Sequence, residues 1–189
     1  IRAAMANKEA GTVAVVTPSG PRFVLPRAGT PLDRTTVWAV IEMGLVMRLE
    51  TFRRVGGFDE TIGTGAASPW QAGEVTDLLL RALAADPDLA REFAWITAAT
   101  VGGVEEGAGL TPDRRAWKLR SYGRGIGRVY RLHRYPVHVT AAFVVAGLLV
   151  GVRRSDEYRL RDGWGAMLGR WEGVAGRVFA GSRRFAVTR

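Results

Sequence analysis

The sequence predicts an α/β fold in its first part, followed by a helical, basic and partly apolar tail. Strand-like and helix-like runs alternate over residues 1–111, and 47% hydrophobic content in 189 residues is enough to bury a core. Charge changes abruptly along the chain: residues 1–111 hold 10 Lys/Arg and 13 Asp/Glu, whereas residues 112–189 hold 17 and 5. We therefore expect two regions, 1–111 and 112–189, of which the second should seek phosphate-bearing partners.

The first fifty residues favour strands, because runs of β-branched and aromatic residues alternate with the turn-forming segments TPSGP and RAGTPLD. Gly44 interrupts the longest run and indicates a bend or a close backbone approach. The opening ten residues resemble the end of a helix, so we expect the chain to be the later part of a longer polypeptide. The predicted strands are residues 12–16, 22–25 and 37–47, and a helix over residues 49–55 should end at Gly56 and Gly57.

The next helix has two possible starts. Ser68-Pro69-Trp70-Gln71 has the form of a capping box, whereas Gly73 predicts a helix from Glu74 to about Ala85. In either case Leu79, Leu80 and Leu83 fall on one face and should pack inward. Glu74, Asp77 and Arg81 share another face.

The second region is predicted to be mostly helical. Residues 91–101 indicate a strand, and Thr111 is a plausible cap for a helix from about Arg114 to Pro136. An apolar stretch follows over residues 136–152, and an amphipathic stretch covers residues 158–179. The glycines of GRGIG at residues 123–127 do not form a phosphate loop, because no Gly-Lys-Ser/Thr ending follows.

The apolar stretch at residues 136–152 is interrupted only by His138 and is flanked by arginines, among them Arg153 and Arg154. As a helix it would extend about 25 Å, which is short of the roughly 30 Å of a bilayer core. A buried core helix is one interpretation. A helix at the interface of an anionic membrane agrees better with the flanking arginines.

Two features before the predicted helix could carry chemistry. The loop GTGAASPW would let a substrate approach the backbone, with Trp70 as a stacking face for a sugar; the alternative is a connector with one core tryptophan. Glu74 or Asp77 could act as a general base, or both could simply complement the helix dipole. The absence of cysteine excludes thiolate metal sites and cysteine nucleophiles, and two histidines do not predict a zinc site.

Several stretches stand in the order found in a known family. Together they resemble the acceptor-side half of family 2 glycosyltransferases, which are inverting enzymes of the GT-A, Rossmann-like fold. The last two also resemble a bacterial, membrane-associated subgroup. The stretches are residues 44–48 (GLVMR), 55–60 (VGGFDE), 63–65 (GTG), 73–81 (GEVTDLLLR), 121–125 (SYGRG) with 133–136 (HRYP), and 168–173 (LGRWEG).

The resemblance implies transfer of a hexose from a nucleotide-sugar to a hydroxyl of a saccharide or lipid-linked acceptor. It implies a catalytic carboxylate at the start of the 74–85 helix; the usual position holds Val75, so the role falls to Glu74 or Asp77, and we favour Glu74. Binding roles carry over to Gly44, Thr64, Gly65, Trp70, Gly73, Arg124, His133 and Arg134.

A divalent metal, Mg or Mn, is implied for the full-length enzyme, held by an Asp-x-Asp motif. That motif does not occur in a suitable place here, so its ligands and the nucleotide-binding half are expected upstream of Ile1, and this chain alone is expected to be inactive. The resemblance further implies cell-surface polysaccharide or glycolipid synthesis at the cytoplasmic face of the cell membrane. The chain would be the C-terminal part of a GT-A glycosyltransferase domain followed by its helical tail.

Two other hypotheses stay open at this point. One is a non-enzymatic basic module that binds anionic lipid or nucleic acid through residues 112–189, although the aromatic residues do not form a stacking platform for nucleic acid. The other is an inactive, truncated relative of the family, in which no carboxylate replaces the base.

Overall fold

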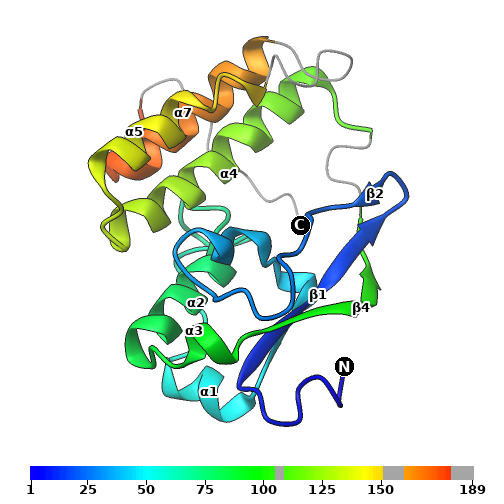
Figure 1. Ribbon diagram of the computed structural model, residues 1–189. Coiled ribbons are helices and arrows are strands. Elements are labelled where there is room, and N and C mark those ends of the chain that lie inside the picture. The colour runs from blue at the N-terminus through cyan, green and yellow to red at the C-terminus, as the bar shows by residue number, and fades with distance from the viewer. Residues whose placement is uncertain (105–108, 151–159, 180–189) are drawn as a thin grey trace. The chain divides into compact units, whose positions relative to one another are not determined.

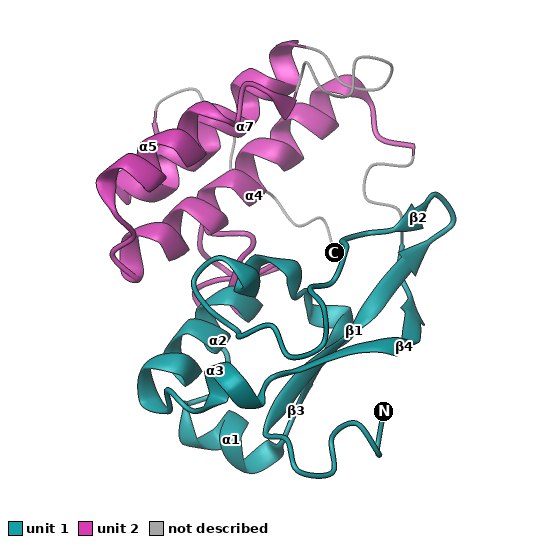
Figure 2. Ribbon diagram, in the orientation of Figure 1, with its two compact units in different colours: residues 1–58, 75–108 teal, residues 59–74, 109–189 magenta. Residues whose placement is uncertain are grey.

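The computed structural model describes residues 1–104, 109–150 and 160–179 and divides into two compact units (Figures 1 and 2). The first unit contains residues 1–58 and 75–108, and the second contains residues 59–74 and 109–189. The expected division at residues 111 and 112 lies beside the point where the chain enters the second unit for the last time. The segment 59–74, however, belongs with the helical tail in this division.

The first unit is a mixed α/β structure with a mixed sheet centred on β1 (Ala10–Thr17). This strand pairs in parallel with β4 (Ala94–Gly102) and antiparallel with β2 (Gly20–Pro21) and β3 (Leu45–Met47). Val13 and Val15 of β1 are almost fully buried, as are Trp95 and Ile96 of β4. The β1 and β4 predictions are confirmed to within a few residues.

Gly44 lies where the sequence predicted a close backbone approach. A Cβ atom there would be 2.5 Å from the carbonyl oxygen of Val13, so no larger residue fits against β1. Gly44 therefore belongs to the packing of the first unit.

One predicted strand is wrong, and another is correct only over its last three residues. Residues 22–25 are not a strand, because β2 ends at Pro21, and most of residues 37–47 form two 3-10 helices, η1 (Thr36–Ala39) and η2 (Glu42–Gly44), before β3. Asp33 supplies the physical reason: its Oδ1 accepts hydrogen bonds from the N–H groups of Thr35 and Thr36, both at 2.7 Å. This closes the chain into a turn that buries Val37. Residues 2–7 form turns rather than the expected end of a helix.

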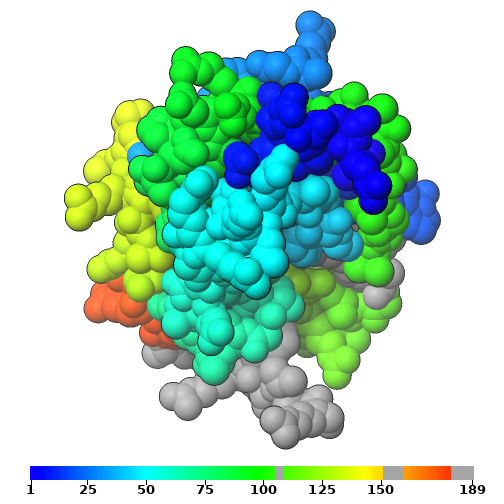
Figure 3. Space-filling model, turned by 90° about the horizontal axis from the view of Figure 1, so that it is seen from below, coloured from blue at the N-terminus to red at the C-terminus, as the bar shows by residue number. Residues whose placement is uncertain are grey.

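The helices of the first unit are α1 (Leu49–Arg54), α2 (Glu74–Ala85) and α3 (Leu89–Glu92). Helix α1 ends at Gly56 and Gly57, which adopt φ of 81° and 70° as the glycine pair predicted. It lies at the surface, where Figure 3 shows it in cyan. Of the two possible starts of α2, the one at Glu74 is correct, and Leu79 and Leu80 are buried as expected.

The second unit contains α4 (Pro112–Leu132), α5 (Val137–Val145) and α7 (Leu160–Ala175). Thr111 caps α4 by accepting a hydrogen bond from the N–H of Arg114, as predicted. Helices α4 and α7 pack along their length (Figure 1). Their backbones touch at glycines on both sides, which leave no space for side chains: Gly123, Gly127, Gly165, Gly169 and Gly173.

The α4–α7 contact also buries charge. Glu172 is fully buried and accepts hydrogen bonds from Arg120 at 3.0 Å and Arg124 at 2.6 Å. Asp162, 1% exposed, pairs with Arg115 at 3.0 Å. Several arginines of α4 therefore form buried ion pairs with α7 and do not belong to a solvated face.

No helix in the part of the chain that the structure describes is both long and apolar enough to cross a membrane. Arg153 and Arg154, which the sequence placed beside the apolar stretch, lie outside the described residues, as do residues 151 and 152.

Candidate functional site

The candidate site is the segment of residues 59–74, which lies on helix α4 within the second unit and is hereafter called the acceptor loop, a name taken only from the resemblance described above. The backbone of Ala72 packs directly on Gly125, where no Cβ atom would fit. Gly73 adopts a φ of 100°, and a Cβ atom there would be 2.8 Å from Cγ2 of Val129. The glycines of GRGIG are therefore packing residues of a helix, with Gly125 against this loop.

Hydrogen bonds inside the acceptor loop fix its shape. The N–H of Gly63 donates to the carbonyl oxygen of Trp70 at 2.8 Å, and the N–H of Trp70 donates to Oγ of Ser68 at 3.0 Å. The side chain of Gln71 crosses the loop: its Nε2 donates to Ala66 and its Oε1 accepts from the N–H of Gly65 at 3.1 Å. Ser68 thus shapes the loop instead of capping α2, and Gln71 is a structural residue that sequence reasoning missed.

Glu74 stands where the acceptor loop becomes helix α2, and its side chain is half-buried. It lies against Gly63, whose φ is 125° and at which a Cβ atom would be 3.3 Å from Oε2 of Glu74. The Glu74 carboxylate makes no hydrogen bond or ion pair with any residue that the structure describes. A polar group that is largely buried normally has a hydrogen-bond partner. Water or a ligand can therefore take that role for the Glu74 carboxylate.

A cation and an aromatic face accompany this carboxylate. The guanidinium carbon of Arg128 is 5.5 Å from the ring centroid of Trp70, within cation–π range. The Arg128 side chain donates no hydrogen bond within the described residues, and its Nε is buried. Sequence reasoning predicted Trp70 but missed Arg128, whose only signal was its place one turn after Arg124 on a basic helix.

Asp77, the other candidate base, has a different environment. It is 3% exposed, and its Oδ2 accepts a hydrogen bond from Nε of Arg81 at 2.8 Å, which confirms the predicted pairing on one helix face. Arg81 in turn donates to the carbonyl oxygens of Val55 and Gly57. Asp77 therefore orients the arginine that holds the glycine turn after α1.

Replacing Asp77 with Asn should destabilise the first unit by about 1–3 kcal/mol, because a charge-assisted hydrogen bond is lost from a buried position. Chemical denaturation of the purified protein measures this, with Asp88→Asn as the control: Asp88 pairs with Arg91 in an exposed i,i+3 bridge. If Asp77→Asn leaves stability unchanged, the positioning role of Asp77 is wrong.

The remaining predicted site residues do not all lie together. Thr64, Gly65, Trp70 and Gly73 come together with Glu74 in the acceptor loop, and Thr64 Oγ1 donates to the carbonyl oxygen of Gln71 at 3.3 Å. Arg124 is 4% exposed and bound to Glu172, so its guanidinium is committed to the packing of α4 on α7. His133 and Arg134 lie at the C-terminal end of α4, where Arg134 has a φ of 49°.

No group of three or more His, Asp or Glu residues in the described ranges could hold a metal ion. Asp86 and Asp88, the only Asp-x-Asp pair, bind Arg54 and Arg91 respectively.

No family model, curated protein or solved structure matches the chain.

Proposed function

We propose that this chain supplies the acceptor side of an inverting glycosyltransferase of the GT-A fold, with Glu74 as the general base. One observation carries the proposal: the Glu74 carboxylate, half-buried beside glycine backbone, has no protein partner in the described residues. A carboxylate in such a setting can accept a proton from a bound hydroxyl.

The order of elements supports the same proposal. Strand β3 leads into α1, the Gly56–Gly57 turn, the acceptor loop, α2 and then β4. The sequence motifs that resemble family 2 glycosyltransferases lie on these elements in that order. Asp77 and Arg81 hold the turn, which leaves Glu74 as the acid without a structural partner.

In the proposed reaction an acceptor hydroxyl donates a hydrogen bond to the Glu74 carboxylate. As the hydroxyl oxygen forms a bond to the anomeric carbon, its proton moves to Glu74, and the bond from that carbon to the nucleoside diphosphate breaks with both electrons leaving on the phosphate oxygen. Because no enzyme nucleophile intervenes, the single displacement inverts the anomeric configuration. The acceptor sugar would stack on Trp70, beside the positive charge of Arg128.

Replacing Trp70 with Ala should raise the KM for the acceptor roughly two- to tenfold and change kcat little, because stacking on an aromatic ring is worth about 0.5–1.5 kcal/mol. Steady-state kinetics with varied acceptor concentration tests this. With a water-soluble acceptor, Trp164, which is 55% exposed on α7, provides a matched Trp→Ala control with no expected effect on this KM. Equal KM changes in both variants would remove Trp70 from the proposed site.

The proposal as a whole is tested by acceptor-dependent release of nucleoside diphosphate from a panel of nucleotide-sugars. The protein to use is the polypeptide in which this chain follows a nucleotide-binding half, as the resemblance implies. The expected result is release with one donor that requires a saccharide or lipid-linked acceptor. Release with no donor of the panel would contradict the proposed function.

A further inference from the structure

Helix α5 presents an apolar surface of a kind that is rare on a protein facing only water. Seven of its nine residues are apolar, yet none is buried. Val137 is 85% exposed and Val145 is 60% exposed, and Leu148 and Leu149 just beyond the helix are 38% and 43% exposed. Such a contiguous apolar patch indicates a surface that another phase or molecule covers.

The other side of α5 is firmly anchored in the second unit. The ring of Phe143 stacks on Tyr130 with a centroid distance of 4.1 Å and an interplanar angle of 10°. Arg170 of α7 lies over the same ring and donates a hydrogen bond to the carbonyl oxygen of Phe143 at 2.6 Å. Because these contacts fix α5 to α4 and α7, its exposed face is a stable feature of the folded unit.

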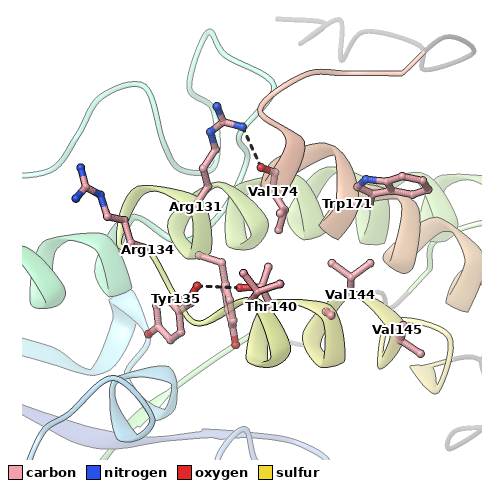
Figure 4. A pocket seen from close by; sticks show the side chains of 11 residues that line it. Arg131, Arg134, Tyr135, Thr140, Val144, Val145, Trp171 and Val174 are labelled. Atoms are coloured by element: carbon pink, nitrogen blue, oxygen red, sulfur yellow. Dashed lines mark hydrogen bonds between the residues drawn. The ribbon is translucent and has the colours of Figure 1, made fainter.

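Beside α5 runs a groove of about 470 Å³ (Figure 4). Its walls are mostly apolar, with Val144, Val145 and the indole of Trp171 toward one end, and Arg131 and Arg134 toward the other. Arg131 donates to the carbonyl oxygen of Val174, whereas the side chain of Arg134 extends away from the groove. The groove thus has an apolar end and a cationic end.

Among the described residues, the charge around this surface has one sign. No acidic residue occurs between Asp113 and Asp156 in the sequence. The described acids of α7, Asp162 and Glu172, are buried and bound to arginines of α4. In the part of the chain that the structure describes, the exposed charge next to α5 is therefore positive, and it complements a layer of phosphate groups.

From these observations we propose that α5 and its groove dock on an anionic phospholipid surface. The exposed valines and leucines enter the boundary between headgroups and acyl chains, and Arg131 and Arg134 lie against lipid phosphates. Trp171 and Trp164, 53% and 55% exposed on α7, are residues that favour the same interfacial depth. A protein partner would need acidic groups opposite the arginines and is an outcome of the test below.

Co-sedimentation of the 189-residue chain with phosphatidylcholine vesicles, with and without added phosphatidylglycerol as the anionic lipid, tests the proposal. Val137→Asp should weaken binding to the anionic vesicles at least tenfold. Val24→Asp is the matched control, because Val24 is 87% exposed in the other unit and should keep wild-type binding. Far-UV circular dichroism confirms that both variants fold, as expected for changes at exposed sites.

Charge is tested separately from apolar contact. Arg134→Glu should weaken binding to anionic vesicles roughly tenfold or more, and raising the salt concentration should weaken wild-type binding. Binding that is equal on neutral and anionic vesicles, or that survives Val137→Asp, overturns the proposal. So does binding to single-stranded RNA without binding to vesicles, or self-association through α5 without either. These readouts do not depend on sugar transfer, so their outcome is independent of the proposed function.

Discussion

Glu74→Gln is expected to reduce kcat for sugar transfer by about 10²–10⁴-fold, the usual contribution of a positioned general base. Glutamine is nearly isosteric with glutamate but cannot take the proton of the acceptor hydroxyl. Since Glu74 makes no hydrogen bond or ion pair with the described protein residues, the substitution breaks no internal contact. The acceptor KM and the melting temperature should change little.

Glu92→Gln is the matched control, because Glu92 is an exposed acid at the end of α3. It should retain wild-type kcat. If Glu74→Gln is within twofold of wild type, Glu74 is not the base. If Asp77→Asn lowers kcat hundredfold while its stability is unchanged, the base is Asp77 and the assignment argued here is reversed.

Glu172→Ala is expected to destabilise the second unit by about 3–5 kcal/mol, because it leaves two arginines of α4 without their common partner in a buried place. Arg120 and Arg124 both bind this carboxylate, and the N–H of Phe179 donates to its Oε1 at 2.8 Å. Thermal or chemical denaturation followed by circular dichroism measures the loss.

Asp113→Ala is the appropriate control for that experiment. Asp113 also forms a salt bridge between α4 and α7, to Arg161, but both side chains are more than half exposed. An exposed pair contributes little to stability, so this variant should unfold close to the wild type. Equal destabilisation by the two substitutions would contradict the special role of the buried network.

The same network predicts a dependence on pH. Burial raises the pKa of Glu172, but hydrogen bonds from Arg120, Arg124 and the N–H of Phe179 outweigh it and hold this pKa below its ordinary value of 4.5. A carboxylate whose pKa is lowered by folding stabilises the folded state above its unfolded pKa. The contribution of Glu172 is therefore complete above about pH 4.5 and should be lost as the pH falls below that value.

Features set by local signals could be predicted from the sequence. Thr111 and the glycine pair 56–57 mark helix ends through contacts with their immediate neighbours, and both predictions are confirmed. The strand prediction for residues 37–47 failed over most of its length because Asp33, outside the run, closes the chain into a turn. In addition, Gly44 must pass β1 closely. Gly44 itself indicated the close approach, but a period-two pattern within the run does not contain the effect of Asp33.

The candidate site depends on contacts between residues far apart in the chain. Nothing around Ala72 indicates that its backbone rests on Gly125, one of the contacts that the acceptor loop makes within the second unit. In the same way Arg124 and Arg128 are alike in the sequence, yet one is committed to Glu172 and the other faces Trp70. Only the packing of α4 distinguishes a structural arginine from one available to a ligand.

The anomeric configuration of the first transfer product tests the central claim most directly, because a single displacement assisted by one carboxylate must invert it. Nuclear magnetic resonance of the product formed from an α-linked nucleotide-sugar gives the answer in one experiment. The account predicts a β-linked product from the wild-type protein and a rate at least hundredfold lower from Glu74→Gln. An α-linked product, or transfer that does not need Glu74, would contradict it.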